Sequence, residues 1–472
     1  MTDPIFHDPI ERILDLIEQT RYEDLPAEVI EVATVFFLDT VGVACAGRLA
    51  PKLDELIAAS ARWGSAGDTG ASVWNTGMRA PGPVAALING YQCHALEYDC
   101  VYEPGVILPT PPIFSALMVK VDELSARGQS PSGRDLIRAF VVALEVSCTL
   151  SGAARSAMFF FRPSTTGVFS ALAALACLDP LPRAQLRHAF GIGYSQMCGP
   201  MQAHEEGSMM LAMQMGFASR NAIQAQDMAR MGITSPVELL GGRFGYFNNF
   251  EHAHDLPSAL DAMGAPWKVT QLSHKPFPSG RVTHGVIHVM RGLRQEFDLT
   301  AANALERVRS VHVTLPPLGM RLVGRPMVHQ PAPNYARLCI PFVAAAEVIF
   351  GGVDPTTFKP ERLGNATVET LARRVITGEK QHPNPNAFYP QSLTLELVSG
   401  ERITREIPYA WGHPLLPLNA QEREDKFRLC WHLTREHGAA QDQQMEAMLD
   451  WLRRLPEAGN AEPLVALLAS KA

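Results

Sequence analysis

The spacing of apolar residues predicts helices through roughly the first 265 residues of the chain. A first helix is expected behind the Asp8–Pro9 pair, with an apolar stripe formed by Ile10, Ile13, Leu14 and Ile17. A second helix begins near Pro26 and is apolar almost all round, so we expect it at the centre of a core. The Ser132–Asp135 segment is typical of a capping box and predicts a buried helix over 136–149.

The pattern changes to strict alternation after Trp267. Apolar and polar residues alternate over 311–315 and 393–397, and Ser399-Gly400 supplies a turn into a further strand at 403–407. A buried helix is predicted at 341–351, and helical spacing returns after Asn419. We therefore predict a mainly α protein with a smaller α+β domain. Its all-helical domain comprises residues 1–267 plus 411–472, and residues 268–410 form an inserted α+β lid domain.

The composition fits an ordinary globular protein and disfavours several classes. The 472 residues are 47% hydrophobic and 19% charged, with a net charge of −7, which suits buried cores and offers no basic field for nucleic acid. The eight cysteines form no C-x-x-C pair, which favours reduced thiols. The Met1–Pro4 start lacks the features of a signal peptide, and apolar stretches such as 139–146 and 341–351 are too short to span a bilayer. We expect a cytoplasmic protein without a membrane partner.

A polar cluster at 94–103 is the first candidate for chemistry. His94, Glu97, Asp99 and Glu103 place three carboxylates and an imidazole next to an apolar helix, where their pKa values can be shifted for acid–base work. The alternative is a helix end whose acidic residues face water. His94 and Glu97 also have the spacing of metal ligands on one helix face, but no companion His or Cys motif accompanies them. We expect no metal.

A basic loop at the predicted domain boundary is the second candidate. Lys275, Arg281 and His284 lie in a segment stiffened by two prolines, and such cations suit a carboxylate-bearing substrate. The alternative is an interdomain linker with surface cations. A third segment, Arg162 to Gly167, carries hydroxyls that either contact a ligand or only cap a helix. Phosphate-binding loops, dinucleotide fingerprints and nucleophile elbows are absent from the sequence, so no cofactor is expected.

Together these segments resemble the 2-methylcitrate dehydratase (MmgE/PrpD) family, whose members include dehydratases, decarboxylases and epimerases. The resemblance runs in order along nearly the whole chain, through Phe37–Gly47, His94–Asp99, Ser164–Gly167, Lys275–Arg281, Ala336–Pro341 and Gly412–Leu418. It implies a homodimer in which each subunit has a mostly helical domain and a smaller α+β lid, with the active site between them. It also implies cofactor-free chemistry on small di- or tricarboxylates.

The sequence departs from the family pattern at positions that bear on chemistry. Cys100 and Val101 stand where the family usually has an aspartate and a threonine, and the histidine of the following turn is missing or replaced by Glu103. A second histidine corresponds to Phe161, and a lysine ahead of Gly216 corresponds to Leu211. Lys275 and Arg281 are retained. A substrate with fewer carboxylates or a larger apolar part would suit these changes.

We therefore predict a lyase, either a dehydratase or a decarboxylase, acting on a small carboxylic acid. Lys275 is the expected key cation, and the expected acid–base groups are His94, Glu97, Asp99 and Glu103. The expected substrate contacts are Arg281, His284, Arg162, Ser164, Thr165 and Leu211. One alternative is an isomerase or epimerase that moves a proton beside a carboxylate. Another is a non-catalytic binding protein, which a pocket filled by the side chains of Phe159–Phe161 would favour.

Overall fold

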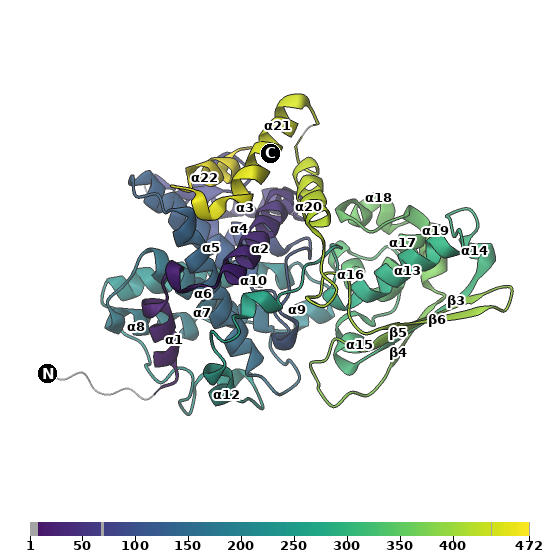
Figure 1. Ribbon diagram of the computed structural model, residues 1–472, viewed down its shortest axis with the longest axis horizontal. Coiled ribbons are helices and arrows are strands. Elements are labelled where there is room, and N and C mark those ends of the chain that lie inside the picture. Colours follow the sequence, from purple (N-terminus) through teal and green to yellow (C-terminus); the bar gives the residue numbers. More distant parts are fainter. Residues whose placement is uncertain (1–7, 68–69, 436, 472) are drawn as a thin grey trace.

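The computed structural model describes residues 8–67, 70–435 and 437–471 and consists of a helical body joined to a smaller mixed α/β unit (Figure 1). The first residues, on which the expectation about a signal peptide rests, lie outside the described residues. The main helices of the body are α1 (Ile10–Gln19), α2 (Ala27–Ala46), α3 (Leu53–Ser60), α4 (Gly82–His94), α5 (Thr110–Ala126), α6 (Gly133–Gly152), α7 (Arg162–Leu178), α8 (Arg183–Ser195) and α10 (Met210–Arg230). Short helices α9 (Gln202–Glu205), α11 (Tyr246–Phe250) and α12 (Leu256–Asp261) follow the longer ones.

Helix α2 lies inside the body, as its apolar circumference predicts. It packs against α4, α6, α20 (Ala420–His432) and α21 (Ala439–Arg453), which cover it from several sides. Among the described residues, the span Ala27–Leu49 is long and apolar enough to cross a membrane by length and composition alone, and 78% of that window is buried within the protein. A buried core helix passes the same test, and this burial accounts for the composition of α2.

Local capping explains where several helices begin. The hydroxyl of Ser132 accepts a hydrogen bond from the amide of Asp135, whose carboxylate accepts in return from the amide of Ser132, so the predicted capping box of α6 is confirmed. Asp8 accepts hydrogen bonds from the amide of Ile10 at the start of α1 and from the amides of Leu240 and Gly241. Its carboxylate therefore joins the first helix to a distant loop.

The helical body also contains a small hairpin that the apolar spacing does not predict. Strands β1 (Ala71–Val73) and β2 (Met78–Ala80) pair antiparallel, and the buried carboxylate of Asp122 on α5 accepts a hydrogen bond from the amide of Ser72. Each strand has only three residues, which is too short for an alternating pattern to stand out.

The smaller unit is built on a four-stranded mixed sheet in the order β4-β3-β5-β6. Its strands are β3 (Val308–Leu315), β4 (Val375–Glu379), β5 (Gln391–Leu397) and β6 (Arg402–Ile407); β3 runs parallel to β4 and antiparallel to β5. Helices α13 (His284–Glu296) and α17 (Ile340–Phe350) pack on each other and on the sheet. The apolar residues of β3 and β5 are buried at every second position, as their alternation predicts.

Short helices link the strands and longer helices of the smaller unit, and the last helices return to the body. The connecting helices are α14 (Ala304–Arg307), α15 (Pro317–Val323), α16 (Pro333–Arg337), α18 (Pro360–Leu363) and α19 (Ala366–Ala372). After Asn419, which caps α20 (Ala420–His432), the chain continues into α21 (Ala439–Arg453) and α22 (Glu462–Ala469). Figure 1 shows these yellow helices lying over the body rather than over the sheet. The division at residues 268 and 410 remains a prediction.

Candidate active site

The acidic cluster at the end of α4 is buried, so the alternative of a helix end whose acidic residues face water is wrong. His94 and Asp99 are 1% and 0% exposed, and Glu97 is 9% exposed. The chain turns sharply after His94, because the amide of Glu97 donates to the carbonyl of His94 at 2.8 Å and Glu97 adopts a left-handed conformation with φ of 52°. A non-glycine residue in this region is strained, and the surrounding contacts hold it there.

Lys275 lies directly against this turn. The basic loop reaches it because Val101 and Ser273 exchange two backbone hydrogen bonds of 2.9 and 2.8 Å, which fix the loop beside the acidic segment. The fully buried ammonium of Lys275 donates to Oε2 of Glu97 at 2.7 Å and to the Glu97 carbonyl at 3.2 Å. An ammonium has three donors, so these two contacts leave one of them for a ligand.

The imidazole of His94 lies between the carboxylates of Glu97 and Asp99. Its Nδ1 lies 2.9 Å from Oδ1 of Asp99, and its Nε2 lies 3.5 Å from Oε1 of Glu97. Burial lowers the pKa of His94, but the two carboxylates outweigh burial and raise it above its usual value. Burial likewise raises the pKa of Glu97, yet Lys275 and His94 reverse this and bring it to about 2. Glu97 is therefore ionised at neutral pH, with His94 on one side of its carboxylate and Lys275 on the other.

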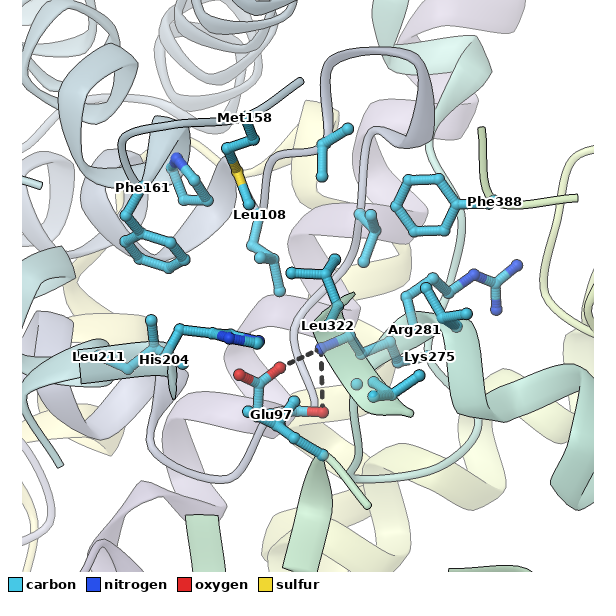
Figure 2. Close-up of a pocket in the computed structure, with 17 residues that line it drawn as sticks. Glu97, Leu108, Met158, Phe161, His204, Leu211, Lys275, Arg281, Leu322 and Phe388 are labelled. Atoms are coloured by element: carbon cyan, nitrogen blue, oxygen red, sulfur yellow. Dashed lines mark hydrogen bonds and ion pairs between the residues drawn. The ribbon is translucent and has the colours of Figure 1, made fainter. Parts of the chain in front are cut away.

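Glu97 and Lys275 open onto a pocket between the body and the smaller unit (Figure 2). The free space between its walls amounts to about 530 Å³, a figure that includes space open to solvent. Its wall is mainly apolar and comes from both parts of the chain: Val101, Val106, Leu108, Met158, Phe161, Pro163 and Leu211 from the body, and Val282, Leu322, Val323, Leu338 and Phe388 from the smaller unit. Apart from the aliphatic part of Arg281, the polar side chains in the wall are Glu97, Lys275 and His204.

His204, on α9, is a pocket residue that the sequence analysis missed. Burial, followed by the positive charge of Arg325, lowers its pKa to about 4, so the ring is neutral at pH 7. Nη2 of Arg325 lies 3.5 Å from Nδ1 of His204, and a guanidinium only donates hydrogen bonds. This contact favours the tautomer whose proton is on Nε2. A histidine in a four-residue helix gives no periodic signal in the sequence.

Glu103, Arg281 and His284 form a separate buried network beside the pocket. Nε of Arg281 donates to Oε1 of Glu103 at 2.7 Å, and Nη1 donates to the carbonyls of His274 and Trp411. Figure 2 shows the guanidinium directed away from the pocket. Nε2 of His284 lies 3.1 Å from the carbonyl oxygen of Ser279. In this conformation, Glu103 and Arg281, which were predicted to act on substrate, instead hold the basic loop against the body.

The predicted contacts from α7 are also engaged elsewhere. Arg162 is buried and forms an ion pair with Glu251, with 2.6 Å between Nε and Oε1. The hydroxyl of Ser164 donates to the carbonyls of Cys198 and Gln214, and that of Thr165 lies 3.0 Å from the Tyr246 hydroxyl. None of these three residues lines the pocket, whereas Leu211 does. The start of α7 has no side-chain cap hydrogen bond, so the helix-cap alternative is not confirmed either, and these side chains instead join α7 to neighbouring segments.

The phenylalanines at 159–161 leave the pocket open. Only Phe161 of the three lies in the pocket wall, while Phe159 is 62% exposed and Phe160 packs edge-on against Phe250. The feature that would favour a non-catalytic binding protein, a pocket filled by these rings, is therefore missing from the described structure.

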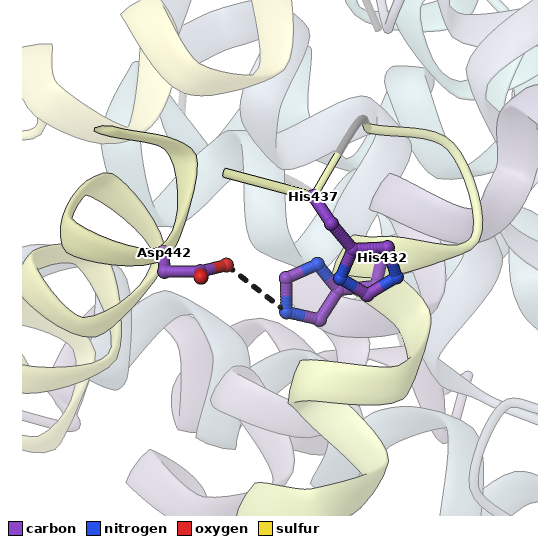
Figure 3. Close-up of side chains that lie close together, drawn as sticks. All are labelled: His432, His437 and Asp442. Atoms are coloured by element: carbon purple, nitrogen blue, oxygen red, sulfur yellow. Dashed lines mark ion pairs between the residues drawn. The ribbon is translucent and has the colours of Figure 1, made fainter. Parts of the chain in front are cut away.

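A group of potential metal ligands lies elsewhere, at the corner between α20 and α21 (Figure 3). His432, His437 and Asp442 each offer a ligand atom, and these atoms lie within 4.8 Å of one another. The two imidazole rings stack 4.2 Å apart at an angle of 17°. Stacked rings direct their in-plane lone pairs side by side, whereas a tetrahedral ion needs ligands that converge. None of the three lines the pocket, and the expectation of an enzyme without a metal remains a prediction.

Comparisons with known proteins agree with this two-part arrangement. The MmgE/PrpD N-terminal domain matches residues 11–258, and the MmgE/PrpD C-terminal domain matches residues 277–452. A cis-aconitate decarboxylase from Mus musculus is 24% identical over 439 residues, which cover 89% of this chain and 86% of the relative. Those from Homo sapiens and Aspergillus terreus are 26% and 23% identical, over 76% and 83% of this chain and 74% and 82% of their own lengths.

The fold and the two domain matches define a two-domain protein from a family of lyases. Because the two domain matches together span most of the chain, the protein belongs to the MmgE/PrpD family. Glu97 falls within the first matched range, and Lys275 falls in the short segment between the two.

Proposed function

We propose that this protein is a lyase that acts on a small carboxylic acid with one carboxylate at the reacting end and an apolar remainder. The observation that carries the proposal is the buried Lys275–Glu97 pair at the wall of an otherwise apolar pocket. Membership in a family of lyases and the similarity to cis-aconitate decarboxylases support the reaction type. The apolar wall supports the substrate class, because buried apolar side chains offer nothing to a second or third carboxylate.

Lys275 is the proposed anchor for the substrate carboxylate. Its third ammonium donor is available beside the pocket, and a carboxylate bound there shares the lysine with Glu97. A second negative charge at this distance raises the pKa of Glu97, which in the free protein is held at about 2. Substrate binding therefore makes Glu97 a stronger base at the point where a proton beside the bound carboxylate is removed.

His204 is the proposed hydrogen-bond donor to the leaving group. Its neutral ring carries a proton on Nε2 in the tautomer favoured by Arg325, and the ring lies in the pocket wall with Glu97 and Lys275. In a dehydration, Glu97 takes the carbon-bound proton and passes it to the departing hydroxyl, which leaves as water while the Nε2–H of His204 donates a hydrogen bond to its oxygen. In a decarboxylation, CO₂ leaves and the carbanion carbon takes a proton that Glu97 has acquired from solvent. The ammonium of Lys275 stabilises the negative charge that develops in either reaction.

The proposal can be tested by screening mono-, di- and tricarboxylates for a rise in melting temperature and then following the hits by NMR in D₂O. We expect a monocarboxylate, or a dicarboxylate with an apolar branch, to bind and to lose water or CO₂. Deuterium entering recovered substrate without loss of either would identify an isomerase instead. Binding without any reaction would identify a non-catalytic binding protein.

Two variants connect that screen to the site. Lys275→Met should abolish turnover of the hit. Lys268→Met is a matched control, because Lys268 is also a buried lysine with a carboxylate partner, Glu145, and is not part of the pocket wall. Full turnover by Lys275→Met would show that the proposed anchor is wrong.

A further inference from the structure

Three consecutive main-chain carbonyls at the catalytic turn each accept a hydrogen bond from a different buried cation. The carbonyl of Leu96 accepts from Nε of Arg337 at 3.1 Å, that of Glu97 from Lys275 at 3.2 Å, and that of Tyr98 from Lys426 at 2.8 Å. The three donors are at most 5% exposed. They are separated from their acceptors by 241, 178 and 328 residues in the sequence.

The three cations come from different parts of the fold. Arg337 ends α16, Lys275 belongs to the loop between the two matched domains, and Lys426 lies on α20, which packs on α2. Arg337 is further held by the ring of Phe358, 4.4 Å from its guanidinium carbon. Lys426 forms an ion pair of 2.8 Å with Asp39 on α2 and lies 4.2 Å from the centre of the Tyr98 ring. Each cation is therefore fixed by contacts of its own.

Glu97 needs such support because of its backbone. Its φ of 52° is a conformation that side-chain-bearing residues avoid at a cost of roughly 1–2 kcal/mol. In this conformation its carboxylate contacts Lys275 on one side and His94 on the other. If the turn relaxed to an ordinary conformation, the carboxylate would point in another direction. It would then no longer lie within hydrogen-bond reach of the proton that it has to take.

We propose that Arg337 and Lys426 are positioning residues that clamp the main chain on either side of Glu97 and so aim its carboxylate at Lys275 and the pocket. They act through the Leu96 and Tyr98 carbonyls and do not touch the substrate. The expected effect on turnover rests on the proposed function, but the geometry of Glu97 tests the proposal independently. The clamp also joins both parts of the structure at the active site, because Arg337 comes from the smaller unit and Lys426 from a helix of the body.

The experiment compares Lys426→Met and Arg337→Met with Lys268→Met as the matched control. Lys268 donates to the carbonyl of Ala262 at 2.7 Å and pairs with the buried Glu145, so its loss also leaves a buried carboxylate without its cation. The three variants should lose stability, but only Lys426→Met and Arg337→Met should lose kcat, by about 10- to 100-fold with KM little changed. Lys426→Arg, which keeps a donor, should recover part of the loss.

Crystal structures of the same variants give the second measurement. In Lys426→Met we expect Glu97 to leave its left-handed conformation or the Lys275–Glu97 contact to lengthen, and in Lys268→Met we expect neither. If Lys426→Met kept both the geometry and the kcat of the control, the proposal would be overturned. If the wild type turned over no carboxylic acid, the proposed function would fail, and the Glu97 geometry alone would decide the clamp. If Lys426→Met did not fold, Arg337→Met would carry both measurements.

Discussion

The ammonium of Lys275 lies 2.7 Å from Oε2 of Glu97, and this pair joins the first matched domain to the segment that leads into the second, at the wall of the pocket. Both residues are buried, so removing one of them leaves an uncompensated charge. The pair is thus expected to matter for stability as well as for chemistry, and the two effects have to be separated.

A double-mutant cycle separates them. Lys275→Met alone should destabilise the protein by about 3–5 kcal/mol, because the carboxylate of Glu97 then lies buried without its strongest counter-charge. The double variant Lys275→Met/Glu97→Gln should recover most of this loss, because neither charge remains. Urea denaturation of the wild type, Lys275→Met, Glu97→Gln and the double variant measures the coupling free energy between the two residues. Additive losses would mean that the pair contributes little, whereas activity should stay absent from all three variants.

His204 provides a test by pH. Its pKa is about 4 in the folded protein against 6.5 for an ordinary histidine, so the unfolded chain binds a proton first as the pH falls. The stability contributed by neutral His204 is therefore complete above pH 6.5 and is lost as the pH falls toward 4. The difference amounts to about 3 kcal/mol at most.

His204→Gln, which cannot titrate, should lose less stability than the wild type between pH 7 and pH 4.5. Urea denaturation at several pH values within that interval measures this difference. Stability curves that stay parallel would show that His204 is not held neutral in the folded state. Glu97 does not interfere in this interval, because its own depressed pKa of about 2 removes stability only as the pH falls below 4.5 toward 2.

Removal of metal ions should leave turnover unchanged. The proposed reaction uses Glu97, His204 and Lys275, and the group of potential ligands at His432, His437 and Asp442 is not part of the pocket wall. Activity measured before and after dialysis against EDTA tests this, with His437→Ala as a second variant that removes one ligand of that group. A loss of turnover restored by a divalent cation would contradict cofactor-free chemistry.

Much of the fold follows from periodicity, and the exceptions have physical reasons. Helix α2 and strands β3 and β5 carry patterns set by burial on all sides or on every second residue, so both patterns are visible in the sequence. The edge strand β4 buries only Val375 of its five residues and therefore shows no alternation. Pairing with β3 over 311–315, which lies far away in the sequence, makes it a strand.

The position of the site could be predicted from the sequence, but the partners of its charged side chains could not. Residue types at the domain boundary pointed to Lys275 and the acidic cluster, but the direction of a long cation depends on acceptors that only the fold brings near. Arg281 turns to Glu103 and to main-chain carbonyls, and the His204 ring reaches the pocket from a short helix without a pattern. The carbonyl contacts of Arg337 and Lys426 span hundreds of residues and leave no trace in local spacing.

Leu211 offers the sharpest test of substrate class. It lies in the pocket wall where the family pattern has a lysine, so Leu211→Lys should add a cation to a pocket that now has only Lys275 for a carboxylate. We expect the variant to shift binding from monocarboxylates toward di- and tricarboxylates by about tenfold or more, because a charged hydrogen bond contributes about 1.5–3 kcal/mol.

Leu211→Met, which keeps the wall apolar and its volume similar, is the control. Dissociation constants for a matched series of mono-, di- and tricarboxylates, measured by calorimetry for the wild type and both variants, give the comparison. If Leu211→Lys kept the preference of the wild type, residue 211 would not face the part of the substrate that carries a further carboxylate. Leu211 would then no longer support the argument for a substrate with an apolar remainder.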